Sequence, residues 1–400
     1  MRIISQGIFW LLMLVGIFLS IWIVLPAPIF SLLPLSVGAP EISPSIICLD
    51  TAALILGSIK LWSRYPHKRR RSLLSLCLLV LALGLSSSPL IQFGAVQQQA
   101  EQAIAASLGR DYQHDLSPLL RAKMRSKPLI LGDLWRGIPQ SPVRIDRKIP
   151  FAQPDGVNLS LTIYRPAQVG TYPGIISIYG GAWQRGSPDS DDTFNRYIAA
   201  QGYVVWSIDY RHAPAYQFPT QLEDVRSALS YIKEHAASNE TDLDRVAVIG
   251  RSAGAQLAML AAYAPTPFPI RAVVDYYGPV DLTAGYYDPP TPDPIESKSV
   301  LRDFLGGTPQ QFAELYRQAS PLNTVKPDLP ASLLIYGGKD HIIEAKFGKR
   351  LAQNLDAQGN RAVFIEIPWA DHAFDVVFSG LSNQLALYYT ERFLAWQLQS

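Results

Sequence analysis

The sequence contains few cysteines and few charged residues, and each shortage restricts what the protein can be. Only two cysteines occur in 400 residues. Both of them, Cys48 and Cys77, lie in the apolar N-terminal third, which excludes a disulfide framework and a cysteine-rich metal site. Charged residues make up only 17% of the chain and hydrophobic residues 48%, so an apolar segment accompanies a globular domain. The formal net charge of +2 provides no basic field for nucleic acid, and no nucleic-acid partner is expected.

Three apolar runs at the start of the chain predict transmembrane helices. They span residues 8–25, 42–59 and 72–93. Each is close to the roughly 20 residues that cross the hydrocarbon core of a bilayer. The second run is the weakest because it contains Pro44 and Asp50, and we interpret Asp50 as an interfacial residue. Residues 1–93 are therefore predicted to be a transmembrane anchor, with the membrane as a partner.

A basic loop between the second and third runs predicts the orientation of the anchor. The loop contains six basic residues, namely Lys60, Arg64, Lys68, Arg69, Arg70 and Arg71. The loop between the first two runs contains only Glu41 as a charged residue. By the positive-inside rule the basic loop is cytoplasmic, and three spans then place everything after residue 93 on the extracytoplasmic side. A cleaved signal peptide would account for the first run alone and not for the two that follow.

Residues 94–140 are more polar and predict a linker or neck. Four basic residues occur there near two prolines, namely Arg121, Lys123, Arg125 and Lys127. We interpret them as a solvated surface, and contact with lipid headgroups is the alternative.

Residues 141–400 alternate between short β-rich runs and helical patterns. Eight strands are expected, at residues 143–151, 157–164, 174–179, 203–209, 246–249, 272–277, 332–336 and 363–367. Helices are expected at residues 221–235, 253–263, 346–358 and 381–397. This alternation, with almost wholly apolar inner strands, is typical of an α/β fold with a mostly parallel sheet that is buried on both faces. Functional residues in such a fold lie just beyond the carboxyl ends of strands.

The segment Gly250-Arg251-Ser252-Ala253-Gly254 lies between an expected strand and an expected helix. This is the setting of a nucleophile elbow, in which a serine is held at a tight, strained turn. Glycines two residues before and after the serine leave room for the neighbouring strand and helix, and the helix N-terminus favours negative charge nearby. The motif predicts that Ser252 is a nucleophile.

A serine hydroxyl needs a base to remove its proton, and His372 is the best candidate. It follows the last expected strand, and Asp340 follows the strand before it. The chain order Ser, Asp, His is the one this arrangement uses, with the carboxylate holding the imidazole in the correct tautomer. Asp371 and Asp375 are weaker candidates for the acid because they share the loop of His372. The other five histidines are interpreted as surface or packing residues, and no cluster predicts a metal site.

A second glycine-containing turn predicts the group that binds a developing oxyanion. It reads Gly180-Gly181-Ala182-Trp183 and follows the strand expected at residues 174–179. Small residues allow the main chain to approach a substrate carbonyl oxygen. The predicted oxyanion hole comprises Gly180, Gly181, Ala182 and Ala253.

Several blocks in this order resemble the α/β-hydrolase superfamily, and more narrowly its carboxylesterase and hormone-sensitive-lipase-like (BD-FAE-like) branch. The blocks are Ile178 to Trp183, Asp209 to Pro214, Gly250 to Gly254, Ser320 to Leu322, and the loops of Asp340 and His372. The resemblance covers about residues 143–397. It implies an eight-stranded sheet flanked by helices, no cofactor, and hydrolysis of a carboxylic ester through an acyl-enzyme formed on Ser252.

The sequence departs from the family pattern at the oxyanion loop. The branch usually has His-Gly-Gly-Gly there, and Tyr179 and Ala182 replace the first and last of these residues. An alanine keeps its amide, so the oxyanion hole is expected to survive. The replacement of histidine by Tyr179 leaves the anchoring of the loop open.

The substrate is the least determined part of the prediction. Trp183, Tyr210 and Phe374 are the candidate residues of an apolar pocket. Residues 285–319 are a candidate cap over it, or a passive excursion of the chain. The expected substrate is a small-molecule acyl ester, with lipid esters included. There are three alternatives. The protein could cleave an amide, as a peptidase or amidase does, or transfer the acyl group to an acceptor other than water. It could also be a non-catalytic binding ectodomain.

Overall fold

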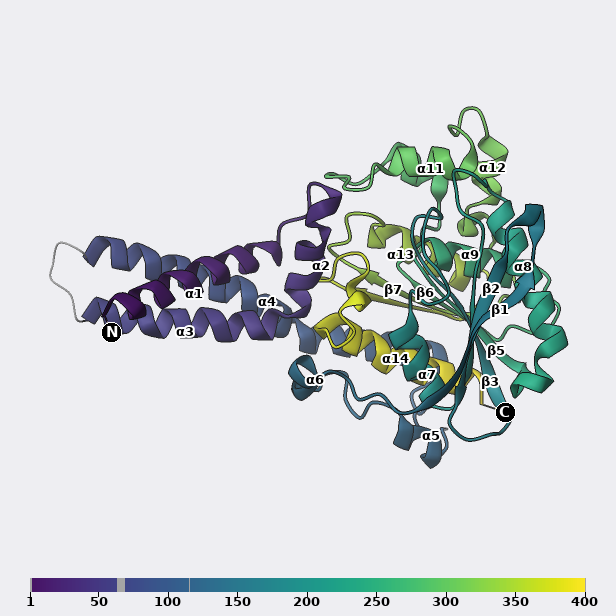
Figure 1. Cartoon of the computed structure of the whole chain (residues 1–400), viewed down its shortest axis with the longest axis horizontal. Helices are drawn as coiled ribbons and strands as arrows, with labels where there is room; N and C mark the ends of the chain where they lie inside the picture. Colours follow the sequence, from purple (N-terminus) through teal and green to yellow (C-terminus); the bar gives the residue numbers. More distant parts are fainter. Residues whose placement is uncertain (1, 63–68, 115, 400) are drawn as a thin grey trace.

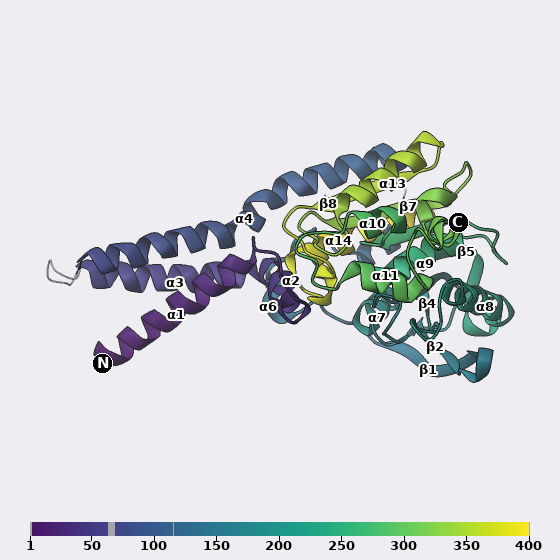
Figure 2. The ribbon, with the colours of Figure 1, turned by 90° about the horizontal axis from the view of Figure 1, so that it is seen from above.

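The N-terminal apolar runs form long helices that project from an α/β body (Figures 1 and 2). The computed structural model describes the backbone of residues 2–62, 69–114 and 116–399. Helices α1 (Arg2–Trp22), α3 (Ser43–Trp62) and the first half of α4 (Arg69–Leu108) lie side by side as a bundle. A 3-10 turn, η1 (Phe30–Leu32), and the short helix α2 (Leu33–Glu41) join α1 to α3 beside the α/β body.

The bundle presents large apolar side chains to its surroundings, and Leu11, for example, is 63% exposed. An extended apolar surface marks contact with lipid or with another protein. Among the described residues one helix, Leu73–Leu108, is long and apolar enough to cross a membrane, and the bent pair Phe30–Glu41 and Ser43–Ile59 would add a second. The sequence predicted three spans. The apolar part of α1, Gly7–Trp22, is too short to pass the same test, and Arg64 and Lys68 of the basic loop lie outside the described residues.

From the sequence alone we interpret Asp50 as an interfacial residue. It is fully buried between the three helices of the bundle. Its Oδ2 accepts hydrogen bonds of 2.9 Å from Ser20 on α1 and from Ser86 on α4. A polar group buried in an apolar bundle needs such partners, and here they connect all three helices.

Helix α4 passes through the predicted anchor boundary at residue 93 without ending. It continues past Pro89 to Leu108, and it packs against β8 (Ala362–Ile367) and α14 (Leu381–Gln397) of the α/β body. The physical reason is an apolar face that is buried in the main core, formed by Val96, Ala100 and Ile104. One helix therefore belongs both to the bundle and to the α/β body.

The α/β body is built on an eight-stranded sheet, which confirms the strand count predicted from the sequence. Its first seven strands are β1 (Val143–Ala152), β2 (Leu159–Pro166), β3 (Tyr172–Ile178), β4 (Val204–Ile208), β5 (Thr241–Arg251), β6 (Ala272–Tyr276) and β7 (Ala331–Gly337). The order is β1-β2-β4-β3-β5-β6-β7-β8. Strand β2 is antiparallel to both of its neighbours and the strands from β4 to β8 are parallel, so the sheet is mixed.

Helices cover both faces of the sheet (Figure 1). On one face lie α7 (Asp192–Ala200) and α14, and on the other lie α8 (Thr220–His235), α9 (Ala253–Ala262) and α13 (Ala345–Ala357). The helices α11 (Ser297–Leu305) and α12 (Ala313–Gln318) lie within the predicted cap, and α10 (Leu282–Tyr287) overlaps its start. The inner strands are almost wholly buried, as the apolar runs predicted.

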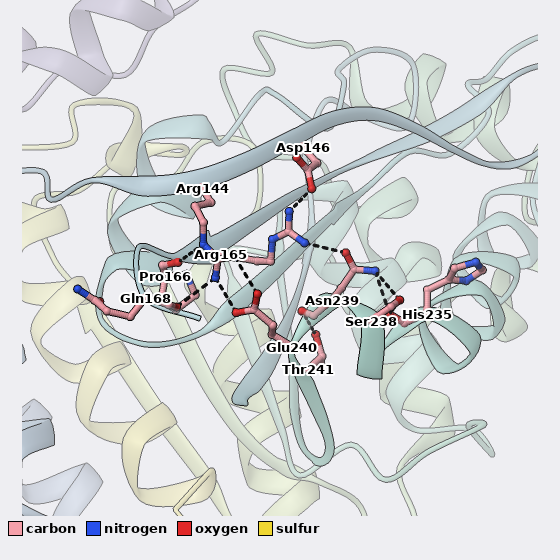
Figure 3. A network of polar contacts seen from close by, with 10 residues as sticks. All are labelled: Arg144, Asp146, Arg165, Pro166, Gln168, His235, Ser238, Asn239, Glu240 and Thr241. Atoms are coloured by element: carbon pink, nitrogen blue, oxygen red, sulfur yellow. Dashed lines mark hydrogen bonds and ion pairs between the residues drawn. The ribbon is translucent and has the colours of Figure 1, made fainter. Parts of the chain in front are cut away.

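A polar network fixes the antiparallel edge of the sheet at the start of β5 (Figure 3). Arg144 on β1 binds both carboxylate oxygens of Glu240, at 2.8 and 2.6 Å. Arg165 on β2 contacts Asp146 and donates to Asn239 at 3.0 Å. These contacts hold β1 and β2 at the amino end of β5, which leaves the opposite edge of the sheet to the loops that follow the parallel strands.

Arg125, which the sequence predicted to be solvated, is buried in the neck. Its side chain donates to Asp133 at 3.1 Å and to Gln384 at 2.6 Å. Its main-chain amide donates to Glu391 at 2.7 Å. The neck, with helices α5 (Pro118–Lys123) and α6 (Leu131–Arg136), is therefore attached to α14. A buried ion needs such partners, and the sequence pattern does not show that α14 supplies them.

Replacement of Arg125 by alanine should destabilise the protein, because Asp133 would stay buried without its partner. We expect the free energy of unfolding to fall by about 3 kcal/mol. The matched control is Arg121→Ala, which removes an exposed side chain and should change that free energy by no more than about 0.5 kcal/mol. Chemical unfolding in detergent, followed by tryptophan fluorescence, measures both. Equal stability of the two variants would show that the neck does not depend on this ion pair.

Candidate active site

The parallel part of the sheet brings the three predicted catalytic residues to one edge. Ser252 follows β5, Asp340 follows β7 and His372 follows β8. Because β5 to β8 are parallel, the loops at their carboxyl ends meet on the same side. Ser252 and His372 are 120 residues apart in the chain and yet lie within hydrogen-bonding distance.

Ser252 lies at a turn with a strained backbone. Its φ of 50° and ψ of −123° fall in a region that residues with side chains rarely adopt. A Cβ atom on Gly250 would lie 2.4 Å from the carbonyl oxygen of Gly254, and a Cβ atom on Gly254 would lie 2.2 Å from the carbonyl oxygen of Ile178. Glycine is therefore required at both positions for β3, β5 and α9 to approach so closely around the serine.

Ser252, His372 and Asp340 form a continuous hydrogen-bonded chain. The Oγ atom of Ser252 lies 2.9 Å from Nε2 of His372, and Nδ1 of His372 lies 2.8 Å from Oδ2 of Asp340. The other carboxylate oxygen of Asp340 accepts hydrogen bonds of 2.8 Å from the amides of Ile342 and Ile343. These amides fix the carboxylate, and the carboxylate orients the imidazole so that Nε2 can accept the proton of the serine hydroxyl.

The surroundings make His372 a stronger base than a free histidine. Burial alone would lower the pKa of His372, but the charge of Asp340 and the hydrogen bond to it raise this pKa above its ordinary value of 6.5. Asp371 accepts a hydrogen bond of 2.8 Å from the main-chain amide of His372, and Asp375 binds Arg251. Neither of these two carboxylates contacts Nδ1 of the imidazole in the described part of the chain.

The loop after β3 places the predicted oxyanion residues beside the serine. Gly180, Gly181 and Ala182 line the same cavity as Ser252. Within the described part of the chain, the main-chain amides of Gly181 and Ala182 donate no hydrogen bond, so both are available to a substrate oxygen. Ala253 begins α9, and the amides in the first turn of a helix favour negative charge.

Tyr179 anchors this loop at the position where the resembling family usually has histidine. Its hydroxyl donates to Asp209 at 2.6 Å and lies 2.9 Å from Nε2 of His212. Its ring stacks on Tyr210 with 4.5 Å between centroids, and the Tyr210 hydroxyl donates to the main-chain oxygen of Tyr179 at 3.1 Å. Tyr179 therefore attaches the oxyanion loop to the end of β4. The sequence pattern had left the anchoring of this loop open.

A cavity of about 730 Å³ opens beside Ser252 and His372. This volume lies within the range of small-molecule sites. Besides the oxyanion loop, it is lined by residues between Phe30 and Gly38, which belong to the N-terminal part of the chain, and by Ile295 of the predicted cap. No sequence motif indicated that residues between the first and second apolar runs reach the site.

The three aromatic residues proposed for the pocket lie elsewhere. Tyr210 and Phe374 are almost completely buried and are not among the residues that line the cavity. Trp183 lines a smaller cavity of about 60 Å³, where its ring stacks on Phe304 with centroids 4.0 Å apart and its Nε1 donates to Gln256 at 3.0 Å. The rings of Tyr210 and Phe374 fill the space between strand ends and helices, and Trp183 borders only the smaller cavity.

A buried charged cluster, which the sequence did not reveal, lines another side of the main cavity. Arg251 donates to Asp375 at 2.5 Å, and its second nitrogen lies 3.4 Å from Asp191. Tyr277 donates to the same Asp375, and its ring centroid lies 4.6 Å from that of His372. The only available signal was that Arg251 occupies a variable position of the Gly-x-Ser-x-Gly motif. Among the described residues, no group of three or more His, Cys, Asp or Glu side chains is arranged to hold a metal ion.

Solved structures with a similar fold include the thermophilic carboxylesterase EstE1, which was cloned from a metagenomic library. The match has a TM-score of 0.55 at 22% identity, and it covers 78% of this chain and 98% of that chain. The fold is that of the α/β-hydrolases. Residues 161–355, which lie within this α/β-hydrolase fold, match the family model described as BD-FAE.

Two of the proteins with a similar sequence are named as esterases of Mycobacterium tuberculosis. Esterase LipC is 30% identical over 235 residues, which are 54% of this chain and 57% of that protein. Esterase LipQ is 28% identical over 228 residues, which are 54% of this chain and 53% of that protein. The chain spans about half the length of the curated relatives it matches. The α/β body is thus similar to proteins that are named as esterases, and the N-terminal bundle lies outside the BD-FAE match.

The raised pKa of His372 predicts the pH dependence of ester hydrolysis. Only the neutral imidazole can accept the serine proton, so kcat/KM should rise with pH through the pKa of His372, with a midpoint above 6.5. Asp340→Asn removes the charge that raises this pKa, and we expect the midpoint to move to lower pH and kcat to fall by about 10³ to 10⁴. Asp244→Asn, at an exposed position near the amino end of β5 and so away from Ser252, is the control and should keep the wild-type profile. A pH profile with p-nitrophenyl acetate checks both, and an unmoved midpoint in Asp340→Asn would contradict the assigned role.

Proposed function

We propose that the protein is a membrane-anchored serine hydrolase that cleaves carboxylic esters through an acyl-enzyme on Ser252. The observation that carries the proposal is the hydrogen-bonded chain from Ser252 through His372 to Asp340, beside free amides in a cavity of ligand size. The names of the esterase relatives support the ester as the bond that is cleaved. A domain used only for binding would have no need of all three groups within hydrogen-bonding distance.

In the first half of the proposed reaction, Oγ of Ser252 attacks the ester carbonyl carbon. Nε2 of His372 takes the hydroxyl proton as the new C–O bond forms, and the negative charge of Asp340 stabilises the imidazolium. The carbonyl oxygen becomes an oxyanion, which the amides of Ala182 and Ala253 would bind with that of Gly181. The bond to the alcohol then breaks, the imidazolium gives its proton to the leaving oxygen, and the acyl group stays on Ser252.

In the second half, a water molecule replaces the alcohol. His372 takes a proton from this water as its oxygen attacks the acyl carbon, and the same amides bind the second oxyanion. The bond from the acyl carbon to Ser252 breaks, and the serine oxygen recovers its proton from the imidazolium. The products are one alcohol and one carboxylic acid, and no group other than water is consumed.

Ser252 should be the residue that reacts with a fluorophosphonate probe. The wild-type protein should be labelled, and Ser252→Ala should lose labelling and at least about 10³-fold in kcat, because Ser252 carries the only side-chain hydroxyl of the segment Gly250 to Gly254. Ser230→Ala, an exposed serine on α8, is the matched control and should be labelled as the wild type is. Equal labelling of wild type and Ser252→Ala would exclude the proposed nucleophile.

A panel of p-nitrophenyl esters and aminoacyl anilides then separates an esterase from a peptidase or amidase, since only an esterase should prefer the esters.

The anchor is proposed to cross the membrane three times, with the catalytic domain on the extracytoplasmic side. The exposed apolar side chains of the bundle and the apolar helix Leu73–Leu108 support the membrane, and the basic loop supports the orientation. Protease added to spheroplasts should digest the part of the chain after residue 93. The same digestion after detergent lysis is the control. Full protection in spheroplasts, with digestion after lysis, would reverse the proposed orientation.

A further inference from the structure

The connection between the first two apolar helices forms part of the cavity at Ser252. Five residues of η1 and α2 line this cavity, namely Phe30, Leu33, Pro34, Val37 and Gly38. We call residues 30–38 the wall segment. Ser252 and His372 line the same cavity, so a ligand held at the serine lies against the anchor as well as against the α/β body.

Prolines and a sharp bend place the wall segment across the end of the bundle. Helix α1 ends at Trp22, and Pro26 and Pro28 follow, which cannot continue its hydrogen-bond pattern. Helix α2 begins with Pro34 in its first turn, and the Phe30–Glu41 segment makes an angle of 80° with the following helix. The chain therefore turns sideways between two apolar helices, and Figure 1 shows α2 between the bundle and the α/β body.

Contacts to the catalytic loops hold the wall segment in this position. Lys339, which precedes the catalytic Asp340, donates from its Nζ to the main-chain oxygens of Trp22 at 2.7 Å and of Ser36 at 3.3 Å. The amide of Ser382 donates to Glu41 at 2.7 Å, just after the wall segment. These bonds fix the segment to the loop that follows β7 and to the first turn of α14, so the wall segment is held in place at the site.

An apolar surface leads from the bundle to the cavity. Val24, Leu25 and Ile29 are each about half exposed, and they precede Phe30, which is 50% exposed and lines the cavity. The guanidinium of Arg185, from the loop after β3, lies 4.7 Å from the Phe30 ring centroid and supports it from the catalytic side. Phe30 thus faces both the surroundings of the anchor and the space beside the nucleophile.

We propose that the wall segment is the acyl-chain site of the enzyme and that its substrate is a long-chain lipid ester taken from the bilayer in which the anchor lies. This inference rests on the proposed ester hydrolysis and on the proposed anchor. The acyl chain would lie against Phe30, Leu33 and Val37, with its carbonyl carbon at Ser252. The smaller cavity beside Trp183 is the alternative place for the chain, but its volume of about 60 Å³ is too small for a long one.

Gly38 provides the sharpest test because a side chain there would enter open space. A Cβ atom on Gly38 would meet no atom within 4 Å, and Gly38 lines the cavity. Full-length protein in phosphatidylcholine vesicles would be assayed with p-nitrophenyl palmitate and p-nitrophenyl acetate. We expect Gly38→Trp to lower the ratio of kcat/KM for palmitate to that for acetate by about tenfold or more, since filling an apolar site excludes the long chain first. Gly38→Ala should lower this ratio by less than about twofold.

Two further variants keep the test decisive if Gly38→Trp fails to fold. Phe30→Ser removes the half-exposed ring and should also lower the palmitate-to-acetate ratio by about tenfold. Its control is Val169→Ser, because Val169 is also an exposed apolar residue, lies between β2 and β3, and is not among the residues that line the cavity. Gly285→Trp, where a Cβ atom also meets no atom within 4 Å, fills the smaller cavity instead.

The outcomes separate this inference from the proposed function. Ester hydrolysis that depends on Ser252, with a ratio lowered in Gly38→Trp or Phe30→Ser and kept in Val169→Ser, would support the acyl-chain site. Hydrolysis that depends on Ser252 with an unchanged ratio in both variants, or with a ratio lowered by Gly285→Trp alone, would overturn this inference and leave the esterase in place. No hydrolysis and no fluorophosphonate labelling of the wild type would overturn the proposed function itself.

Discussion

The close approach of three backbone segments around Ser252 is the constraint on which the rest of the structure depends. The end of β3, the end of β5 and the start of α9 meet there so tightly that neither Gly250 nor Gly254 has room for a Cβ atom. This contact forces the serine into a strained conformation and exposes its hydroxyl at the edge of the sheet. The loops after β7 and β8 arrive at the same edge because their strands are parallel, and they bring the carboxylate and the imidazole with them.

The loop after β7 has a second role, because it also joins the candidate active site to the N-terminal bundle. Asp340 faces His372, whereas the preceding residue, Lys339, binds main-chain oxygens at the end of α1 and in α2. Helix α4 makes a further connection, since its first half lies in the bundle and its second half is buried against β8. The N-terminal bundle is therefore part of the candidate active site. A soluble truncation that begins after residue 93 would lose one side of the cavity together with the partners of Lys339.

Short sequence patterns were sufficient to predict those features of the structure that depend on neighbouring residues. The eight apolar runs predicted the strands, and the glycines around Ser252 predicted the turn, because each of these features depends on neighbouring residues. Burial of charged residues was not predictable in this way. Arg125 looked like a solvated residue because the residues that bind it, Asp133 and Gln384, lie 8 and 259 positions away. Asp50 likewise finds its serine partners on two other helices.

The sequence by itself determined the α/β alternation and the position of the tight turn at Ser252, and it predicted His372 and Asp340 as the partners of this serine. These follow from periodicity and from the chemistry of single side chains. Only the tertiary structure decided which residues surround the nucleophile. Tyr210 and Phe374 are packed away from the cavity, whereas Phe30 and Gly38 line it. A cavity wall depends on contacts between segments that are distant in the chain, and no local pattern records which segments will meet.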